Sequence, residues 1–587
     1  MGDQLEVDIL PQAVWEKGVP YEALAQLRRH APVYWHAELD GPGFWATTRH
    51  ADDQRRQGDA GRVATGAGRG VMIDSKSGAG KRVLVAVATG YLGKSAARRI
   101  RRYGYGFVAG AIAASAVVLL GGCGSDDDAG QPADFVEVQG AAGYVSTPDL
   151  PKGRPADLSL LDPSERAVVA AADERAPGIR KTTVAMWIDQ PGVDVTITQI
   201  RHGFTFGFPI ELGRFHEPGD LEWFTERMAE NFSLAVLESD AKWAVVEPVQ
   251  GERHFDRADT DIAWAEENGF DVKGHTLLWG IPMPFSSAAL PKWAADRFPS
   301  TDLSPVEQDE LRGILRSFIQ DSVRHYDRRL AYWDVTNETT QPLAQWFNNR
   351  LGPTIVNDAF GWAREVDPDV KLVFNEWIVE VFTGFDSPTA AEVRDRVLEL
   401  LSQGVPIDAL GQQAHFAPTL AFVDPTVDIS GRTRIDDYAV ALDTLAETGL
   451  PIHLTETNFI APDDPEMRAA QAEALMRLWW GHPSVDMIVF WGPWNKVAGR
   501  DEFDVGFWDE DRNITRHGEA VFSLLNDRWR TNVTATPGAD GRFEIDAFYG
   551  DYVAQWTIDG RPYHASFSVR PDAVDGIALT TPGSISP

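Results

Sequence analysis

The stretch Trp333-Asp334-Val335-Thr336-Asn337-Glu338 is an apolar run that stops abruptly at an Asn-Glu pair. Its aromatic and β-branched residues favour a buried strand. A carboxylate at the end of such a strand is equally consistent with a helix N-cap or with one half of an ion pair. The hexapeptide alone therefore indicates a strand and leaves the role of Glu338 open.

The chain on both sides of this stretch alternates short apolar strands with amphipathic helices. Eight candidate strands lie at 204–208, 234–237, 272–278, 330–335, 371–374, 409–413, 452–454 and 487–490. Helical patterns lie between them, for example at 305–326, 391–401 and 465–480. Eight such units predict an α/β fold of the (β/α)8 TIM-barrel type. A doubly wound parallel sheet would show the same alternation.

Polar and aromatic residues follow the candidate strands repeatedly, and this decides between the two architectures. They stand at 238–243, 274–279, 337–338, 375–377, 413–415, 455–458 and 491. In a barrel the carboxyl ends of all strands meet around one axis, where the active site is built. The pattern therefore predicts one polar cleft with aromatic walls and favours the barrel.

The span from about residue 204 to 525 resembles glycoside hydrolase family 10, the endo-1,4-β-xylanases. The resemblance rests on several blocks that occur in the family's order: Lys242-Trp243, Glu247-Pro248 with Gly251, Gly274-His275-Thr276-Leu277-Leu278-Trp279, Trp333 to Glu338, Gln413-Ala414-His415 and Thr455-Glu456. It implies an endo-1,4-β-xylanase-like retaining glycosidase that cleaves internal β-1,4 bonds of xylan or a related plant polysaccharide.

The resemblance also implies the site residues. Glu338 is expected to be the acid/base and Glu456 the nucleophile, and such a pair works only if one carboxyl is protonated while the other is ionised. Asn337 is expected to donate to the sugar 2-hydroxyl, and His415 to hold and tune Glu456. The other expected substrate-binding residues are Lys242, His275, Trp279, Gln413 and Trp491.

Three positions depart from the family pattern. Ser239 replaces a usual Asn, and Gly280 stands where a His usually follows the tryptophan. Both changes put affinity for a plain xylose chain in doubt. Asn458 replaces an Asp that partners the histidine, so His415 is expected to be charged less often, with a consequence for Glu456. We expect activity with an altered substrate preference or pH optimum.

Composition limits the partners. With 587 residues and a formal net charge of -33, the chain is unsuited to nucleic acid, whereas 20 tryptophans suit a neutral sugar polymer. No metal cluster or phosphate-binding loop is evident, so we expect no cofactor and no metal. We further expect a monomer. Two alternatives stay open: a glycanase with a different β-1,4-glycan specificity, and a carbohydrate-binding protein on a degenerate barrel.

The amino-terminal part shows several changes of composition. Residues 1–52 resemble the start of a bacterial haem-thiolate monooxygenase, which we interpret as a non-functional remnant because Cys123, the single cysteine, lacks a haem-loop context. A low-complexity linker is predicted at 53–97. Residues 98–123 combine a basic cluster, an apolar run and Leu120-Gly121-Gly122-Cys123, which resembles a lipobox with lipidation at Cys123.

The protein is therefore expected to be exported, as a cell-surface lipoprotein or a secreted protein, with membrane contact only through the lipid; an uncleaved signal anchor is the alternative. Residues 124–180 read as a polar tether and linker that includes a helical patch. The barrel domain is predicted at 181–530, beginning with a β-hairpin around the Pro191-Gly192 turn, and a small β-rich domain at 531–587. For this last part we favour structural support over carbohydrate binding.

Overall fold

The computed structural model describes residues 135–148, 150–282, 286, 288–383, 387–418, 431–497, 504–571 and 576–582. Before these it describes only five strands: β1 (Val33–His36), β2 (Phe44–Thr47), β3 (Val71–Lys76), β4 (Arg82–Val87) and β5 (Val117–Val118). β1 pairs with β2, and β4 pairs with β3 and β5, all antiparallel. Cys123 and the rest of the predicted remnant, linker and signal segment lie outside the described residues.

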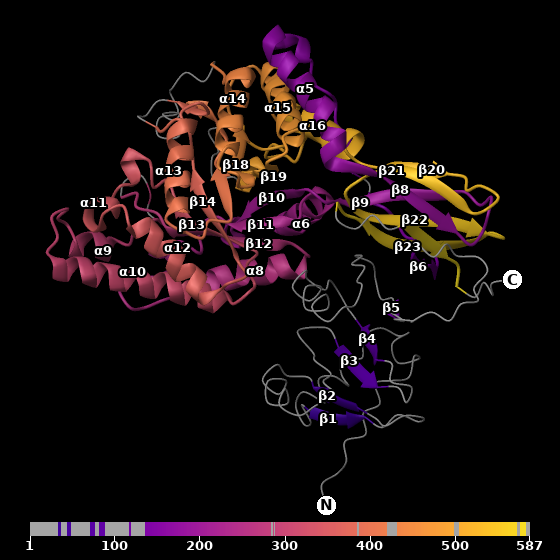
Figure 1. Cartoon of the computed structure of the whole chain (residues 1–587), viewed down its shortest axis with the longest axis horizontal. Coiled ribbons are helices and arrows are strands. Elements are labelled where there is room, and N and C mark those ends of the chain that lie inside the picture. Colours follow the sequence, from indigo (N-terminus) through magenta and orange to yellow (C-terminus); the bar gives the residue numbers. More distant parts are fainter. Residues whose placement is uncertain are drawn as a thin grey trace, which may run out of the picture. The chain divides into compact units, whose positions relative to one another are not determined.

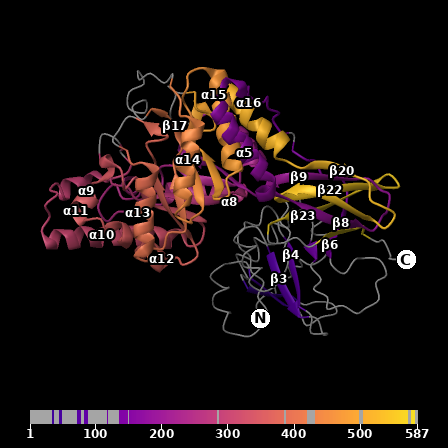
Figure 2. The same ribbon diagram turned by 45° about the horizontal axis from the view of Figure 1, so that its top comes forward.

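The chain divides into two compact units, 1–131 with 585–587, and 132–584. The second unit contains a closed barrel of eight parallel strands (Figures 1 and 2). These are β10 (Thr205–Ile210), β11 (Leu234–Leu237), β12 (Asp271–Leu278), β13 (Tyr332–Asn337), β14 (Lys371–Glu376), β16 (Ala409–Gln412), β18 (Ile452–Phe459) and β19 (Val485–Phe490). β19 pairs with both β18 and β10, which closes the sheet. The predicted TIM barrel is confirmed.

Helices follow the strands and cover the barrel's outside. The longer ones are α6 (Asp220–Asn231), α8 (Asp256–Glu267), α10 (Pro305–Tyr326), α12 (Ile355–Val366), α13 (Ala390–Ser402), α14 (Ile435–Ala446), α15 (Pro465–Trp480) and α16 (Arg516–Phe522). Short elements in the loops are α7 (Trp243–Val246), α9 (Lys292–Arg297), α11 (Asn348–Leu351), β15 (Phe382–Thr383) and β17 (His415–Pro418).

The longest helix shows how local sequence sets these elements. In α10, Ser304 caps the first turn in a reciprocal capping box with Glu307, and Pro305 occupies the first helical position. Leu311, Leu315 and Phe318 recur at helical spacing and are buried against the barrel.

A β-sandwich adjoins the barrel and draws its strands from both ends of the second unit. One sheet has the order β20-β9-β22-β23-β7 and the other β21-β8-β24-β6. The strands are β6 (Phe135–Gln139), β7 (Ala141–Ala142), β8 (Lys181–Ile188), β9 (Val195–His202), β20 (Asn532–Ala535), β21 (Arg542–Phe548), β22 (Gly550–Ile558), β23 (Arg561–Val569) and β24 (Gly576–Thr580). The two sheets share one apolar core.

The expected hairpin at 181–200 does not form. β8 pairs with β21 and β24, whereas β9 pairs with β20 and β22 in the other sheet. The Pro191-Gly192 turn therefore carries the chain from one layer of the sandwich to the other. Alternating apolar residues fit either arrangement, because each strand has one face on the core in both.

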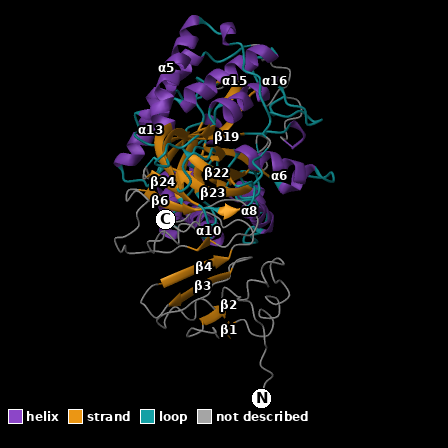
Figure 3. Cartoon of the chain, turned by 90° about the vertical axis from the view of Figure 1, so that its right-hand side faces the viewer, coloured by secondary structure: helices purple, strands orange, loops and turns teal. Residues whose placement is uncertain are grey.

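Helix α5 (Pro163–Arg180) lies between β7 and β8 in the chain and packs beside α15 (Figure 3). At its end the Arg180 guanidinium donates to the carbonyl oxygens of Trp480, His482 and Val485, which lie where α15 leads into β19. The Trp480 ring stacks on Trp529 at 4.4 Å between centroids. This junction ties helix, barrel and sandwich together. Among the described residues, every helix is too short or too polar to cross a bilayer.

Candidate active site

The carboxyl ends of the barrel strands bring the predicted site residues together. Asn337 closes β13 and Glu338 follows it, while Glu456 lies within β18. Gln413 follows β16, and His275 lies within β12. Gly274 has no room for a side chain because the Trp333 ring covers it. Of these residues, only Glu338 keeps part of its surface exposed, as does Trp279, which follows β12.

Three neutral groups hold the Glu338 carboxyl. Trp279 Nε1 donates to its Oε2 at 2.9 Å, and Gln413 Nε2 donates to its Oε1 at 3.0 Å. Asn337 Nδ2 lies 3.3 Å from the same Oε1. The side chain is thus fixed in direction without a cation in direct contact among the described residues.

The Glu456 carboxyl is held by Asn375 and His415. Asn375 Nδ2 donates to Glu456 Oε1 at 2.9 Å and to Asn337 Oδ1 at 2.8 Å. Thr455 Oγ1 donates to Asn375 Oδ1 at 2.6 Å, which fixes the orientation of that amide. His415 Nε2 lies 3.2 Å from Glu456 Oε2. A chain of amides therefore connects the two carboxyl groups.

The two glutamates have opposite pKa shifts. Burial raises the pKa of Glu338 to about 7, and the negative charge of Glu456 adds to the rise. Burial would raise the pKa of Glu456 too, but the hydrogen bond with His415 and the attraction of His275 and Lys242 outweigh it and lower that pKa to about 2. At neutral pH one carboxyl is ionised while the other is close to half protonated.

The remaining predicted residues line the same site. Lys242 Nζ lies 4.9 Å from the Trp279 ring centroid, and burial lowers the pKa of Lys242. The His275 ring lies 5.6 Å from the Trp491 ring, edge to face. His275 Nδ1 is hydrogen-bonded to Asp334 Oδ2 at 2.9 Å, and Lys273 Nζ lies 2.8 Å from Asp334 Oδ1.

Asp334, Asn375 and Glu376 have no role predicted from the sequence, although all three stand at or near the ends of predicted strands. Asn375 donates to Glu456 and to Asn337, whose amide in turn contacts Glu338, and Asp334 fixes the His275 ring. Each of them is a polar side chain that interrupts or ends an apolar strand, which is the same pattern that indicated Glu338. The hydrogen-bond partner of each could not be read from spacing.

Asn458 does not make the contact expected of it. Its backbone lies opposite His415 where β17 pairs with β18, but its buried side-chain amide makes no hydrogen bond to any described residue. The Asn458 amide therefore forms no hydrogen bond by which it could tune His415 as expected. Gly280 meets the carbonyl oxygen of Ala344 so closely that a Cβ would lie 2.6 Å from it, so the histidine usual in the family has no room there.

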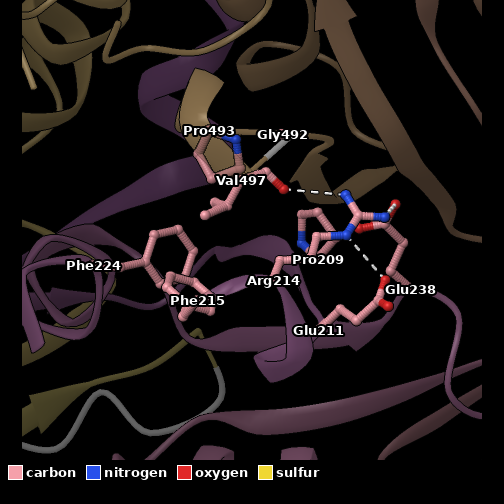
Figure 4. Close-up of a pocket in the computed structure, with 9 residues that line it drawn as sticks. All are labelled: Pro209, Glu211, Arg214, Phe215, Phe224, Glu238, Gly492, Pro493 and Val497. Carbon is pink, nitrogen blue, oxygen red and sulfur yellow. Dashed lines mark hydrogen bonds and ion pairs between the residues drawn. The ribbon is translucent and has the colours of Figure 1, made fainter. Parts of the chain in front are cut away.

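A small pocket lies beside the site, where β10, β11 and β19 end (Figure 4). Arg214 points into it and donates to Glu211 at 3.0 Å, to Glu238 at 2.8 Å and to the carbonyl oxygen of Val497 at 3.1 Å. Glu238, which directly follows β11, is thus paired with the guanidinium of Arg214. Among the described residues, no group of three His, Cys, Asp or Glu side chains is arranged to hold a metal ion.

The fold and the site define an α/β-barrel protein with a two-carboxyl centre, the pairing used in glycosidic bond cleavage. Residues 198–513 match the model of Glycosyl hydrolase family 10, and the chain belongs to this family. The match lies outside residues 1–52 and lends no support to the monooxygenase resemblance there.

Several known proteins are similar to the chain. Anti-sigma-I factor RsgI6 of Acetivibrio thermocellus is 29% identical over 398 residues, covering 66% of this chain and 47% of that protein. Endo-1,4-beta-xylanase 5-like of Arabidopsis thaliana is 28% identical over 372 residues, covering 62% and 58%. The chain thus spans about half the length of these two relatives. The crystal structure of xylanase 10B from Thermotoga maritima aligns with a TM-score of 0.46 at 25% identity, covering 56% of this chain and 96% of that one.

Proposed function

We propose that this protein is a retaining glycoside hydrolase that cleaves internal β-1,4 bonds of xylan or a related plant polysaccharide. Glu338 serves as acid/base and Glu456 as nucleophile. The observation that carries the proposal is the opposite pKa shift of two carboxyl groups in one hydrogen-bonded cleft, about 7 for Glu338 and about 2 for Glu456. Family membership supports the same assignment.

The chemistry follows from those two states. Ionised Glu456 attacks the anomeric carbon while protonated Glu338 gives its proton to the departing oxygen, so the glycosidic bond breaks and a glycosyl ester forms on Glu456. Glu338, now ionised, takes a proton from water, and that water displaces Glu456 from the anomeric carbon. Two displacements at one carbon retain its configuration.

The surrounding groups prepare both steps. Trp279 and Gln413 aim the Glu338 carboxyl without adding charge, so burial still favours its protonated form. Asn375 and His415 hold both oxygens of Glu456. Lys242 and His275 keep the nucleophile ionised through their attraction, and the Trp279 and Trp491 rings provide apolar faces suited to sugar rings.

Xylan is the first substrate to test, because several relatives are named endo-1,4-beta-xylanases. Ser239 and Gly280 replace larger polar residues of the family pattern. These changes support a preference that differs from that for a plain xylose chain. A panel of β-1,4-linked polysaccharides, read by product length and anomer, separates xylan from other β-glycans.

Two variants test the roles. We expect Glu338→Ala and Glu456→Ala each to lower polysaccharide hydrolysis by about 10³-fold or more, since each removes one half of the double displacement. Azide should restore turnover of an activated aryl glycoside by Glu456→Ala and yield a glycosyl azide of inverted configuration. Turnover close to that of the wild type in either variant would show that the assignment is wrong.

We further propose that the protein is exported and held at the cell surface by lipid on Cys123, acting as a monomer. The support is the Leu120-Gly121-Gly122-Cys123 pattern after a basic and an apolar segment. Labelling of cells with a radioactive fatty acid should mark the wild-type protein and leave Cys123→Ser unmarked. Equal labelling of both would exclude this anchor.

A further inference from the structure

A third glutamate lies beside the catalytic pair and takes no part in the steps above. Glu376 ends β14, one residue after Asn375, and is fully buried. Its Oε1 accepts from the backbone N–H of Thr340 at 2.9 Å and from Thr339 Oγ1 at 3.2 Å. Its Oε2 accepts from Gln341 Nε2 at 3.3 Å. The three residues that bind it directly follow Glu338.

The segment that receives these bonds begins with an unfavourable backbone conformation. Glu338 has φ +58°, in the left-handed region, which is unfavourable for a residue with a Cβ. Its backbone N–H donates to the carbonyl oxygen of Asn375, and its own carbonyl oxygen accepts from the backbone N–H of Gln341. This conformation turns the chain out of β13 at the acid/base residue itself, so any relaxation there would move the carboxyl group.

The partners of Glu376 are all neutral. Among the described residues no Lys, Arg or His forms an ion pair with it, and burial raises its pKa to about 8. An apolar side chain would fill the same space at lower electrostatic cost, but it could not accept from the Thr340 N–H, the Thr339 hydroxyl and the Gln341 amide. The carboxyl group is suited to collecting these three donors.

The turn is fixed on its other side as well. Gln345 Nε2 donates to the carbonyl oxygens of Thr339 and Gln341, at 2.7 and 2.6 Å. The backbone N–H of Trp346 donates to the carbonyl oxygen of Gly280, next to Trp279. Trp279 in turn donates to Glu338. The turn is thus held by Glu376 through Thr339, Thr340 and Gln341, and by Gln345 and Trp346, which connect it to the loop of Trp279.

We propose that Glu376 is a positioning residue for acid catalysis: by gathering Thr339, Thr340 and Gln341 it holds the left-handed turn that aims Glu338 at the leaving-group oxygen. This inference rests on the proposed function. Because Glu376 is fully buried, it acts on the reaction only through its effect on Glu338.

Leaving-group dependence tests the proposal. Aryl β-xylobiosides with a 2,4-dinitrophenol leaving group need little protonation, whereas unsubstituted phenyl xylobioside needs the acid. For Glu376→Ala we expect kcat/KM on the phenyl substrate to fall by about 100-fold, within the range that acid catalysis contributes, and by less than about threefold on the dinitrophenyl substrate. Glu338→Ala should show the same pattern more strongly.

Two further variants make the result decisive. Glu376→Gln keeps a carbonyl oxygen for Thr340 and Thr339, so we expect it to recover most of the phenyl activity. Glu380→Gln changes a glutamate in the loop after β14 that accepts instead from the backbone N–H of Ala390, at 3.1 and 3.2 Å, and should match the wild type on both substrates. Circular dichroism and thermal unfolding establish that each variant is folded.

Equal losses on the two substrates by Glu376→Ala and Glu376→Gln would overturn the proposal, because a general structural defect does not distinguish leaving groups. Unchanged activity on phenyl xylobioside in both variants would also overturn it. If instead Glu338→Ala showed no dependence on the leaving group, the proposed function itself would fail, and the wild type and that variant reveal this without any Glu376 variant.

Discussion

At the scale of single residues, the site shows how two glutamates of one barrel acquire different chemistry. Glu338 is held by neutral donors, so burial dominates and its pKa rises to about 7. Glu456 is buried too, but His415 binds it and Lys242 and His275 attract its charge, so its pKa falls to about 2. The difference lies in the neighbours that the strand ends supply.

This difference predicts the pH dependence of catalysis. Glu338 must be protonated and Glu456 ionised, so kcat/KM on a polysaccharide should be high from about pH 3 and fall tenfold per pH unit above about pH 7. With a dinitrophenyl glycoside the alkaline fall should largely disappear, because protonation of the leaving group is no longer needed. An alkaline limb that stays at the same pH with both substrates would contradict the role given to Glu338.

Asn458 predicts a change in stability. Its amide is buried and makes no hydrogen bond to a described residue, so the free-energy cost of desolvating it is not offset by a hydrogen bond. We expect Asn458→Leu to raise the free energy of unfolding by about 1 kcal/mol, measured with urea. The matched variant Asn375→Leu removes a fully hydrogen-bonded amide and should lower it. A loss in Asn458→Leu as large as that in Asn375→Leu would contradict this account.

At the scale of elements, α5 packs on the outside of the barrel and is held there by the buried carboxylate of Glu165. Glu165 has no exposed surface and accepts from the backbone N–H groups of Asp162 and Ile435, both at 2.9 Å. Both of its oxygens also bind the guanidinium of Arg432, which precedes α14. Burial favours a higher pKa for Glu165, but these bonds outweigh it and lower the pKa.

Removing this carboxylate should loosen α5. We expect Glu165→Ala to lower the free energy of unfolding by about 3 kcal/mol, since it leaves Arg432 and two backbone donors without their acceptor. Because the folded-state pKa is depressed, this contribution is present above the unfolded value and is lost as pH falls through the folded one. Glu174→Ala, on the exposed face of the same helix, should change stability by less than about 0.5 kcal/mol. Equal effects of the two variants would refute this role of Glu165.

At the scale of the whole second unit, the sandwich joins segments that are distant in sequence. β8 and β9 come before the barrel, and β20 to β24 come after it, yet their apolar faces share one core. Val184, Met186 and Ile188 of β8 have less than 3% of their surface exposed. Neither set of strands can bury these side chains without the other.

Truncation should show this dependence. Removal of 531–587 leaves β8 and β9 with bare edges and an exposed apolar face, so we expect aggregation of most of the protein during expression. Removal of both 1–202 and 531–587 deletes the whole sandwich and should leave more soluble protein than removal of 531–587 alone, measured by sedimentation. More soluble protein after the single truncation than after the double one would contradict the shared core.

Much of the barrel could be predicted from the residue pattern. The strand at Trp333 to Glu338, the alternation around it and the polar residues at successive strand ends indicated eight βα units and one cleft, because strand and helix periodicity are local properties of a chain. Glu338 and Glu456 followed from motifs at those ends. The apolar pattern also located β8 and β9 as strands.

Only the tertiary structure decided which strands and side chains meet. It placed β8 and β9 in different sheets, since an alternating strand buries one face equally well in a hairpin or in a sandwich. It left the Asn458 amide without the expected bond to His415, and it showed that Asn375 and Asn337 together connect the two carboxyl groups. It also set the opposite directions in which the pKa values of Glu338 and Glu456 are shifted, because burial and neighbouring charge depend on residues that are far apart in the sequence.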